Sequence, residues 1–362
     1  MGQYLSALDV FGRFLYETTL GSYIFVPNPT FTANDVPDLT GKVVIVTGGN
    51  TGIGKETCKV LLQKNAKVYL AARNEGRANA AIAELLAQTG KEAIWLELDL
   101  SFFQSIESAA AEFHSKETEL HILFNNAGLL SPPESLTAEG YDMTFGTNVV
   151  GQFIHVLSKV ETGFLRLQFA GPYYFTELLL PALYKTSTSE NKPRVVNLTS
   201  QMGLIGASAF GSGLDFSTFK DSPKRRKMSG TALYSQSKLG NVVYAQEFAR
   251  RYGDKVISIS VHPGPILSEL PRNDFDPNNP VFRFFFKLVT YPTPMGAITP
   301  LYAGTSPEAE NLNGEYLTQW HRVGTPRSKD PVLGKELWTW LEEQVAGREY
   351  LNKIRAQIAS LK

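Results

Sequence analysis

The strongest constraint on the fold is an apolar strand signal that leads directly into a glycine-rich turn. Residues 42–46 are almost wholly apolar, which is typical of a strand buried on both faces of a parallel sheet. The turn occupies residues 47–54, and residues 55–65 then predict a helix. In this setting small residues let the backbone approach a pyrophosphate, and the helix N-terminus presents free N–H groups to it. A loop that serves only a tight turn is the alternative.

The turn has glycines at positions 48, 49, 52 and 54, and the spacing of 48, 52 and 54 differs from the G-x-G-x-x-G of many dehydrogenases. The order of strand, turn and helix is nevertheless the one that a dinucleotide requires. The residues predicted to bind the cofactor here are Gly48, Asn50, Thr51, Gly52, Ile53 and Gly54.

Further apolar runs alternate with helical stretches along the chain. This alternation favours an α/β fold, a doubly wound parallel sheet of the Rossmann type with helices on both faces and about seven strands. The ligand crevice of such a sheet lies at the carboxyl ends of its strands. The later strands are expected at residues 67–72, 93–98, 122–124, 194–199 and 256–261.

Two residues at strand ends bear on the choice of cofactor. Arg73 follows residues 67–72, near where a dinucleotide fold tests the ribose 2′ position. An acidic residue there would accept from the 2′-hydroxyl of NAD, whereas arginine neutralises the 2′-phosphate of NADP, so we favour NADP(H) and keep NAD(H) and a solvated arginine as alternatives. Asp99 is expected to contact adenine, to cap the following helix, or both.

Tyr234 and Lys238 stand four residues apart, so on a helix they share one face and reach the same pocket. In most proteins an isolated Tyr-x-x-x-Lys is a pair of ordinary surface residues without a catalytic role. Its meaning here comes from the order of the motifs, because the segment Asn-Asn-Ala-Gly at residues 125–128 lies between the glycine-rich turn and this pair.

These three motifs in sequence resemble the short-chain dehydrogenase/reductase family, over roughly residues 38–346. Within the family the chain is most similar to fungal members related to the retinol dehydrogenase and WW-domain oxidoreductase group. Residues 37–42 and 330–341 support that narrower placement. We therefore expect one NAD(P)-binding domain at 38–346, an N-terminal arm at 1–37 and a C-terminal tail at 347–362.

The resemblance implies a role for each predicted catalytic residue. Tyr234 would exchange a proton with the substrate oxygen, and its phenolate would be favoured by the Lys238 ammonium and the cationic nicotinamide. Ser200 would hold that oxygen, Lys238 would bind the nicotinamide ribose, and Asn148 would support a water that links Lys238 to solvent. A helix-capping serine and a turn-forming asparagine are the plain alternatives.

Other positions are also implied to contact the cofactor. The turn at residues 262–265 resembles the family segment that closes over the nicotinamide amide, and we interpret His262 as structural rather than as a general base. The further predicted cofactor contacts are Asn126, Ala127, Gly128, Pro263 and Gly264, beside Tyr234 and Lys238.

Composition limits the remaining classes of function. The chain has 43% hydrophobic residues and a formal net charge of zero, which gives no reason to expect a nucleic-acid partner. The basic run at residues 224–227 is interpreted as a solvated loop. The five histidines show no metal spacing, so no metal is expected. The lone Cys58 fits a reducing, cytoplasmic location.

The N-terminus adds a membrane alternative. Residues 1–6 fit the N-myristoylation pattern, and apolar side chains recur at helical spacing up to Leu15. One acyl chain holds a protein only weakly, so the two interpretations are peripheral contact with an intracellular membrane and an arm packed on the domain. No run of 18 apolar residues predicts a spanning helix.

Directly after Asn148 the chain departs from the family pattern. Relatives continue without interruption into an aromatic, leucine-rich helix, which here would join Gly151 to Pro172, and residues 152–171 look like an insert. We hypothesise a retained intron or gene-model error. Because the helix that follows commonly contributes to the family's dimer interface, we expect a homodimer unless the insert blocks it.

The substrate is predicted from the regions that cover it in this family, residues 203–230 and 265–300. The second region contains Phe282, Phe284, Phe285, Phe286 and Tyr291. An aromatic cover suits a lipophilic ketone, aldehyde or alcohol, and core or dimer packing of the same residues is the alternative. An active reductase is the leading prediction. A non-catalytic NAD(P)-binding protein and, more weakly, a nucleotide-sugar epimerase or dehydratase are the others.

Overall fold

The strand that precedes the glycine-rich turn, β1 (Val43–Thr47), lies inside the sheet, and all five of its residues are buried. It pairs in parallel with β2 (Lys67–Ala72) on one side and with β4 (Ile122–Asn125) on the other. The strand order therefore reverses at β1, which is where open α/β sheets bind their ligands. The computed structural model describes residues 28–128, 142, 144, 148, 171–201, 213–266, 290–324 and 330–360.

The sheet has eight strands in the order β3-β2-β1-β4-β5-β6-β7-β8. Neighbouring strands run parallel as far as β7, and β8 is antiparallel to it. The predicted doubly wound sheet is confirmed, and it has one strand more than the expected seven because the chain folds back after β7 into a very short edge strand. The remaining strands are β3 (Ile94–Glu97), β5 (Arg194–Leu198), β6 (Ile257–Val261), β7 (Tyr316–Thr318) and β8 (Arg322–Val323).

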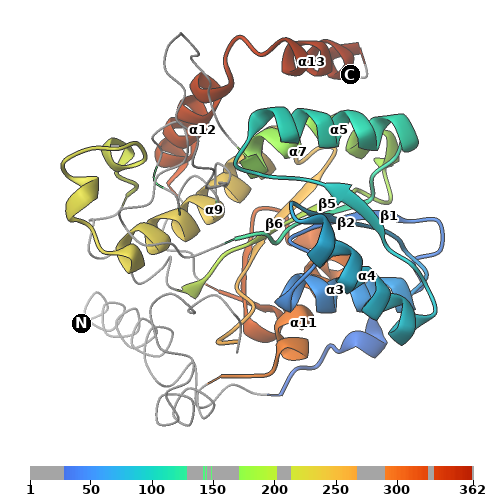
Figure 1. Ribbon diagram of the computed structural model, residues 1–362. Coiled ribbons are helices and arrows are strands. Elements are labelled where there is room, and N and C mark those ends of the chain that lie inside the picture. The colour runs from blue at the N-terminus through green and yellow to red at the C-terminus, as the bar shows by residue number, and fades with distance from the viewer. Residues whose placement is uncertain are drawn as a thin grey trace, which may run out of the picture.

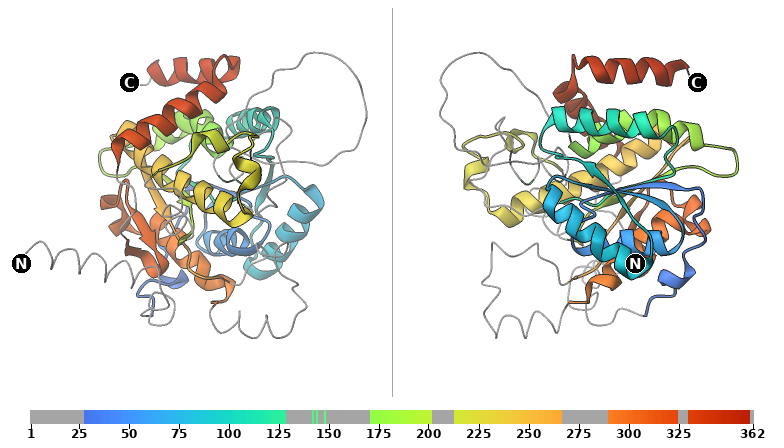
Figure 2. Two further views of the ribbon diagram at one scale, coloured as in Figure 1. Left: turned by 90° about the vertical axis from the view of Figure 1, so that its left-hand side faces the viewer. Right: turned by 45° about the vertical axis from the view of Figure 1, so that its right-hand side comes forward.

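Helices cover both faces of this sheet (Figure 1). The helices α3, α4 and α11 lie on one face, and α5, α7 and α9 lie on the other, with α12 and α13 outside them (Figures 1 and 2). Successive residues of β5 serve the two layers, since Val195 packs in the core beside α7 and Val196 packs in the core beside α11. The helices are α3 (Gly52–Gln63), α4 (Glu75–Thr89), α5 (Phe103–Lys116), α7 (Gly171–Thr186), α9 (Gly230–Tyr252), α11 (Thr293–Thr305), α12 (Pro331–Val345) and α13 (Glu349–Ser360).

Short 3-10 turns connect several of these elements. Two of them, η3 (Phe216–Thr218) and η4 (Arg225–Lys227), lie in the connection between β5 and α9. Another, η7 (Gln319–His321), contains Trp320 in the left-handed region at φ 59°. The others are η1 (Ala33–Asp35) and η6 (Pro307–Asn311).

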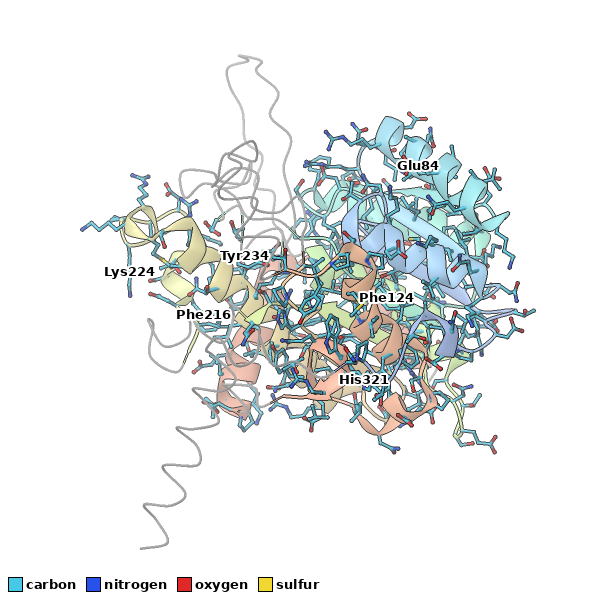
Figure 3. All side chains as sticks on the ribbon, turned by 90° about the horizontal axis from the view of Figure 1, so that it is seen from below. Glu84, Phe124, Phe216, Lys224, Tyr234 and His321 are labelled. Carbon is cyan, nitrogen blue, oxygen red and sulfur yellow. The ribbon has the colours of Figure 1, made fainter. Side chains whose placement is uncertain are left out.

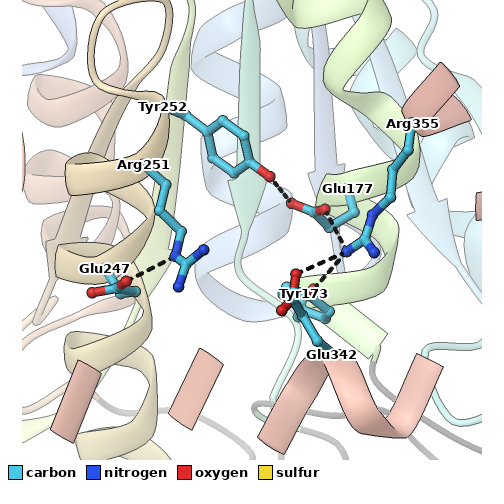
Figure 4. Close-up of polar contacts among 7 residues, drawn as sticks. All are labelled: Tyr173, Glu177, Glu247, Arg251, Tyr252, Glu342 and Arg355. Carbon is cyan, nitrogen blue, oxygen red and sulfur yellow. Dashed lines mark hydrogen bonds and ion pairs between the residues drawn. The ribbon is translucent and has the colours of Figure 1, made fainter. Parts of the chain in front are cut away.

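The segment 347–362, which the sequence sets apart as a tail, contains α13, and this helix packs on α7. A buried acid on α7 anchors it (Figure 4). Glu177 accepts a hydrogen bond from Tyr252 Oη at 2.9 Å, and its other oxygen lies 3.4 Å from Arg355 Nη2 on α13. Arg355 Nη2 also lies 3.3 Å from Glu342 Oε1 of α12. The last helix therefore belongs to the packed core.

The basic run at residues 224–227 is only partly the solvated loop that was expected. Lys224, Arg226 and Lys227 are exposed, but Arg225 is 1% exposed and forms an ion pair with Asp142. The prediction for Arg225 is wrong because the charge pattern of a short run does not show a partner that lies 83 residues away in the chain.

The start of α7 bears on the proposed insert. Gly171, assigned to the insert, lies within α7 together with Pro172. The rest of the insert and the N-terminal residues 1–27 lie outside the described residues. Within the described ranges no helix is both long and apolar enough to cross a membrane. Cys58 is a buried free thiol in α3.

Candidate active site

The glycine-rich turn closes tightly between β1 and α3. Gly48 has φ +65°, and its N–H donates to Ala71 O at 2.8 Å. A Cβ added at Gly54 would lie 2.4 Å from Gly48 O and 2.5 Å from Asn126 Nδ2, so glycine is required for this approach. Thr51 precedes α3 and makes no capping hydrogen bond with its side chain. The arrangement fits the cradle that a cofactor pyrophosphate needs at a helix N-terminus.

Thr47, which the sequence analysis did not single out, ties this turn to the end of β4. Its hydroxyl donates to Phe124 O at 3.2 Å and accepts from the N–H groups of Asn126 and Ala127, both at 3.0 Å. Asn126 Nδ2 in turn donates to Thr47 O at 2.8 Å. The predicted contacts Asn126 and Ala127 therefore lie against the turn. The only feature of the sequence that could have indicated this role is a small hydroxyl side chain at the last position of β1.

The two residues predicted at the ribose and adenine end occupy different environments. Arg73 is exposed directly after β2. Asp99 is largely buried, and its Oδ1 accepts from Ser101 N–H at 2.9 Å. Asp99 thus organises the turn before α5, while Phe102 is the residue in the N-cap position. An adenine contact of Asp99 stays a prediction.

Tyr234 and Lys238 lie on one face of α9, with Lys238 Nζ 5.7 Å from the centre of the Tyr234 ring. The helix is fastened to the end of β5 at this point. Lys238 Nζ donates to Leu198 O at 3.1 Å, and Thr199 Oγ1 donates to Lys238 O at 2.5 Å. Both groups therefore stand at the carboxyl end of β5, where the crevice was expected.

Asn148 and Ser200 complete the group. Asn148 Nδ2 donates to Ser237 Oγ at 2.8 Å, next to Lys238 on α9. A Cβ added at Gly128 would lie 3.0 Å from Asn148 Oδ1 and 3.1 Å from Lys238 Nζ, so these two side chains meet over Gly128. Ser200 is hydrogen-bonded to Tyr234. The structure brings together all four predicted catalytic residues.

The ionisation of this pair differs from the expectation. Burial raises the pKa of Tyr234 to about 12, and the hydrogen bond with Ser200 opposes the rise. Burial lowers the pKa of Lys238 to about 8. The lowering of the Tyr234 pKa that was predicted from Lys238 and the nicotinamide is not found in the isolated chain, where loss of solvent has the largest effect on this hydroxyl. Tyr234 as a whole residue is half-buried.

The turn after β6 reaches toward the glycine-rich turn. Pro263 and Gly264 are buried. A Cβ added at Gly296 of α11 would lie 2.8 Å from Ile266 Cγ1 and 2.9 Å from Ile53 Cγ1, so the residues just after this turn and Ile53 pack on one helix. The predicted cofactor contacts from both turns therefore border one region.

His262 is buried, and burial lowers the pKa of its imidazole to about 3. Neither ring nitrogen has a hydrogen-bond partner among the residues that the structure describes. A neutral imidazole fits the structural role expected for it, which stays a prediction. Across the described ranges no group of three or more metal-ligating side chains occurs.

Most of the predicted aromatic cover, including Phe282 and Phe284–Phe286, lies outside the described residues. Tyr291 is described, and its ring meets Trp320 edge-on at 5.1 Å between centres. Residues 293–300 belong to α11, which packs on α3. For this part of the region core packing is the observed role.

Comparison with known proteins agrees with this fold. Residues 42–212 match the family model described as short chain dehydrogenase. A short-chain dehydrogenase/reductase of Armillaria gallica is 49% identical over 330 residues, which cover 90% of this chain and 97% of the relative. The chain therefore belongs to the short-chain dehydrogenase/reductase family of oxidoreductases, as its motifs predict.

Two further matches show the breadth of this likeness. Mouse retinol dehydrogenase 12 is 33% identical over 339 residues, which cover 92% of this chain and 95% of the relative. The structure of Pseudomonas aeruginosa RhlG in an active-site complex with NADP superposes with a TM-score of 0.57, at 21% identity, over 81% of this chain and 97% of that chain. At that identity the second match supports the fold alone.

Proposed function

We propose that this oxidoreductase uses NADP(H) to interconvert a lipophilic ketone or aldehyde and its alcohol, with Tyr234 as general acid and base. The observation that carries the proposal is the meeting of Tyr234, Ser200, Lys238 and Asn148 at the carboxyl end of β5, on the side of the sheet where the glycine-rich turn opens.

The proposed mechanism assigns one task to each side chain. Bound NADP(H) supplies or accepts the hydride at the substrate carbon. Tyr234 Oη gives a proton to the substrate oxygen during reduction and takes it back during oxidation. Ser200 Oγ orients that oxygen by a hydrogen bond, and Lys238 holds the ribose. Asn148, fixed through Ser237, supports proton exchange at Lys238.

The preference for NADP(H) rests on Arg73. Its exposed position after β2 allows the guanidinium to meet a 2′-phosphate, and no acidic residue precedes it in β2. NAD(H) remains the alternative cofactor. The solved RhlG complex, which contains NADP, is a precedent for this fold and not for this chain.

A lipophilic substrate is supported by the aromatic residues of one segment and by the name of a similar protein. The chain carries aromatic residues at 282, 284–286 and 291 in the region that covers the substrate in its family. The mouse relative is named for retinol, a lipophilic alcohol. A non-catalytic NAD(P)-binding protein is the second candidate, favoured by the insert that follows Asn148.

Assembly and location are further parts of the proposal. We infer a cytoplasmic enzyme whose N-terminal arm packs on the domain, with peripheral contact of the N-terminus with an intracellular membrane as the alternative. A homodimer through the surface of α7 conflicts with the packing of this chain, because residues 171–184 of α7 are all buried within it. A dimer, which light scattering would detect, must therefore use another face.

The test is NADPH oxidation over a panel of lipophilic carbonyls by three proteins: the full chain, the Tyr234→Phe variant, and a deletion of residues 152–171 that joins Gly151 to Pro172. We expect Tyr234→Phe to lose about 10²–10⁴-fold in turnover while it still binds NADPH. The deletion should be more active and more soluble than the full chain, and equal activity would count against the insert hypothesis. NADPH binding without turnover in all three proteins would support the second candidate.

A further inference from the structure

A buried ion pair lies apart from the reacting groups. Arg225 and Asp142 are each 1% exposed. Arg225 Nη2 lies 3.0 Å from Asp142 Oδ2, and Arg225 Nε donates to the same oxygen at 3.1 Å. The Asp142 N–H also donates to Phe219 O at 3.0 Å. Side chain and backbone of Asp142 are thus both attached to the segment 213–229, the described part of the connection between β5 and α9.

This segment is attached to the catalytic helix as well. Gln236, 2% exposed, lies on α9 between the predicted catalytic tyrosine and lysine. Its Oε1 accepts from Asp215 N–H at 2.8 Å, and its Nε2 donates to Thr218 Oγ1 at 2.8 Å. Figure 3 shows Phe216 and Lys224 of the segment on the same side of the molecule as Tyr234.

The other end of the ion pair leads to Asn148. Asp142 comes shortly before Asn148 in the chain, and both Thr144 and Asn148 have helical backbone. Asn148 Nδ2 then returns to α9 through its hydrogen bond to Ser237 Oγ. Printed contacts therefore connect α9, the segment 213–229, Arg225 and Asp142. Asn148 follows Asp142 along the chain and is itself hydrogen-bonded to α9.

We propose that Arg225 and Asp142 are positioning residues, which hold the start of the Asn148 segment against residues 213–229 and thereby set Asn148 against Lys238. The inference rests on the proposed function, in which Asn148 acts on Lys238. A charged pair of this kind is short and directional, and removal of one partner leaves an unpaired buried charge. Neither residue contacts the substrate in this account.

The neighbouring residue offers a matched control. Arg226 has a side chain 67% exposed and pairs with Asp221 at the surface. Arg225→Met and Arg226→Met therefore remove the same charge from adjacent positions, one buried and one exposed. Hydrogen exchange of the full chain should show at least about tenfold faster exchange in peptides spanning residues 142–148 and the start of α9 for Arg225→Met. If Arg225→Met exchanged in these peptides at the same rate as the wild type and Arg226→Met, the proposal would be overturned.

Kinetics provide a second readout that a merely structural role would not move. For Arg225→Met and Asp142→Asn we expect kcat to fall about tenfold or more while the Kd for NADPH stays within about threefold. The double variant should lose less than the sum of the two single losses, because Arg225 and Asp142 contact each other. Arg225→Lys keeps the charge and should recover part of kcat. Additive losses, or a loss carried wholly by NADPH affinity, would contradict the positioning role.

The two proposals fail separately in this experiment. If the wild-type chain reduces no carbonyl, the proposed function fails, and hydrogen exchange still decides whether the ion pair orders the Asn148 segment. If the wild-type chain is active and Arg225→Met keeps its kcat, the positioning role fails alone. Should Arg225→Met not fold, Asp142→Asn replaces it in both measurements with the same criteria.

Discussion

Substitution of Gly54 by alanine tests the cofactor cradle most directly. The new Cβ would lie 2.4 Å from Gly48 O, whereas real Cβ atoms essentially never approach another heavy atom below 3.0 Å. The turn must therefore shift by about 0.6 Å or more at the point where it is expected to meet the pyrophosphate. In an ordinary helix the same change would be favourable by up to about 1 kcal/mol, so the cost arises from this contact.

The expected loss of NADPH affinity follows from the hydrogen bonds that the shifted turn would no longer make to the pyrophosphate. A backbone N–H that donates to a charged phosphate contributes about 1.5–3 kcal/mol. Loss of one such bond weakens NADPH binding about 10- to 150-fold. The assay is a fluorescence titration of the full chain with NADPH, accompanied by thermal unfolding to show that Gly54→Ala is folded.

Gly90→Ala is the matched control for this substitution. Gly90 ends α4 at φ +70° with no atom within 4 Å of an added Cβ. Alanine there costs about 1–2 kcal/mol of backbone strain and leaves the cradle unchanged. A Kd for NADPH within about threefold of wild type in a folded Gly54→Ala protein would refute the reasoning, since a clash with backbone would then have no consequence for binding.

Three further predictions follow from single side chains. Arg73→Glu should weaken NADPH binding at least about tenfold and improve NADH relative to it, because a carboxylate repels the 2′-phosphate; an unchanged preference in paired titrations would exclude this role. The rate of carbonyl reduction should fall as the pH rises through about 8, where Lys238 loses its proton, and Lys238→Arg should move that fall to higher pH; a flat wild-type pH profile of kcat/KM would contradict this. Burial raises the pKa of Glu177 above 4.5, so the folded state keeps the proton of this carboxyl to higher pH than the unfolded chain does. The resulting contribution to the stability of the folded state is complete below pH 4.5 and is lost as the pH rises through the folded-state pKa. Glu177→Gln has no such loss, so the Tm of this variant relative to wild type should increase with pH, whereas a constant difference would show that Glu177 does not titrate in the folded state.

The sheet and the order of its motifs could be predicted because their signals are local. Residues 42–46 are apolar without alternation, and β1 is buried on both faces as that pattern requires. The strand at 67–72 was predicted with the bounds that the structure has. Tyr234 and Lys238 share a face of α9 because residues four apart on any helix do so.

The contacts that place the site could not be predicted in this way. Thr47 joins the turn to Asn126 across 79 residues of sequence, and nothing in the local pattern of β1 shows that partner. The direction of the Tyr234 pKa shift also depends on the surroundings, since burial of the hydroxyl has the largest effect on it once the helix is packed.

What the sequence by itself determined was the family, the parallel sheet, and the residue types of the candidate site, because periodicity and motif order are properties of the chain. Only the tertiary structure decided that Arg225 is buried against Asp142 and that α13 is docked through Arg355 on Glu177. The physical reason is that the worth of a charge depends on its solvation and on its partner, and both are created when distant segments pack together.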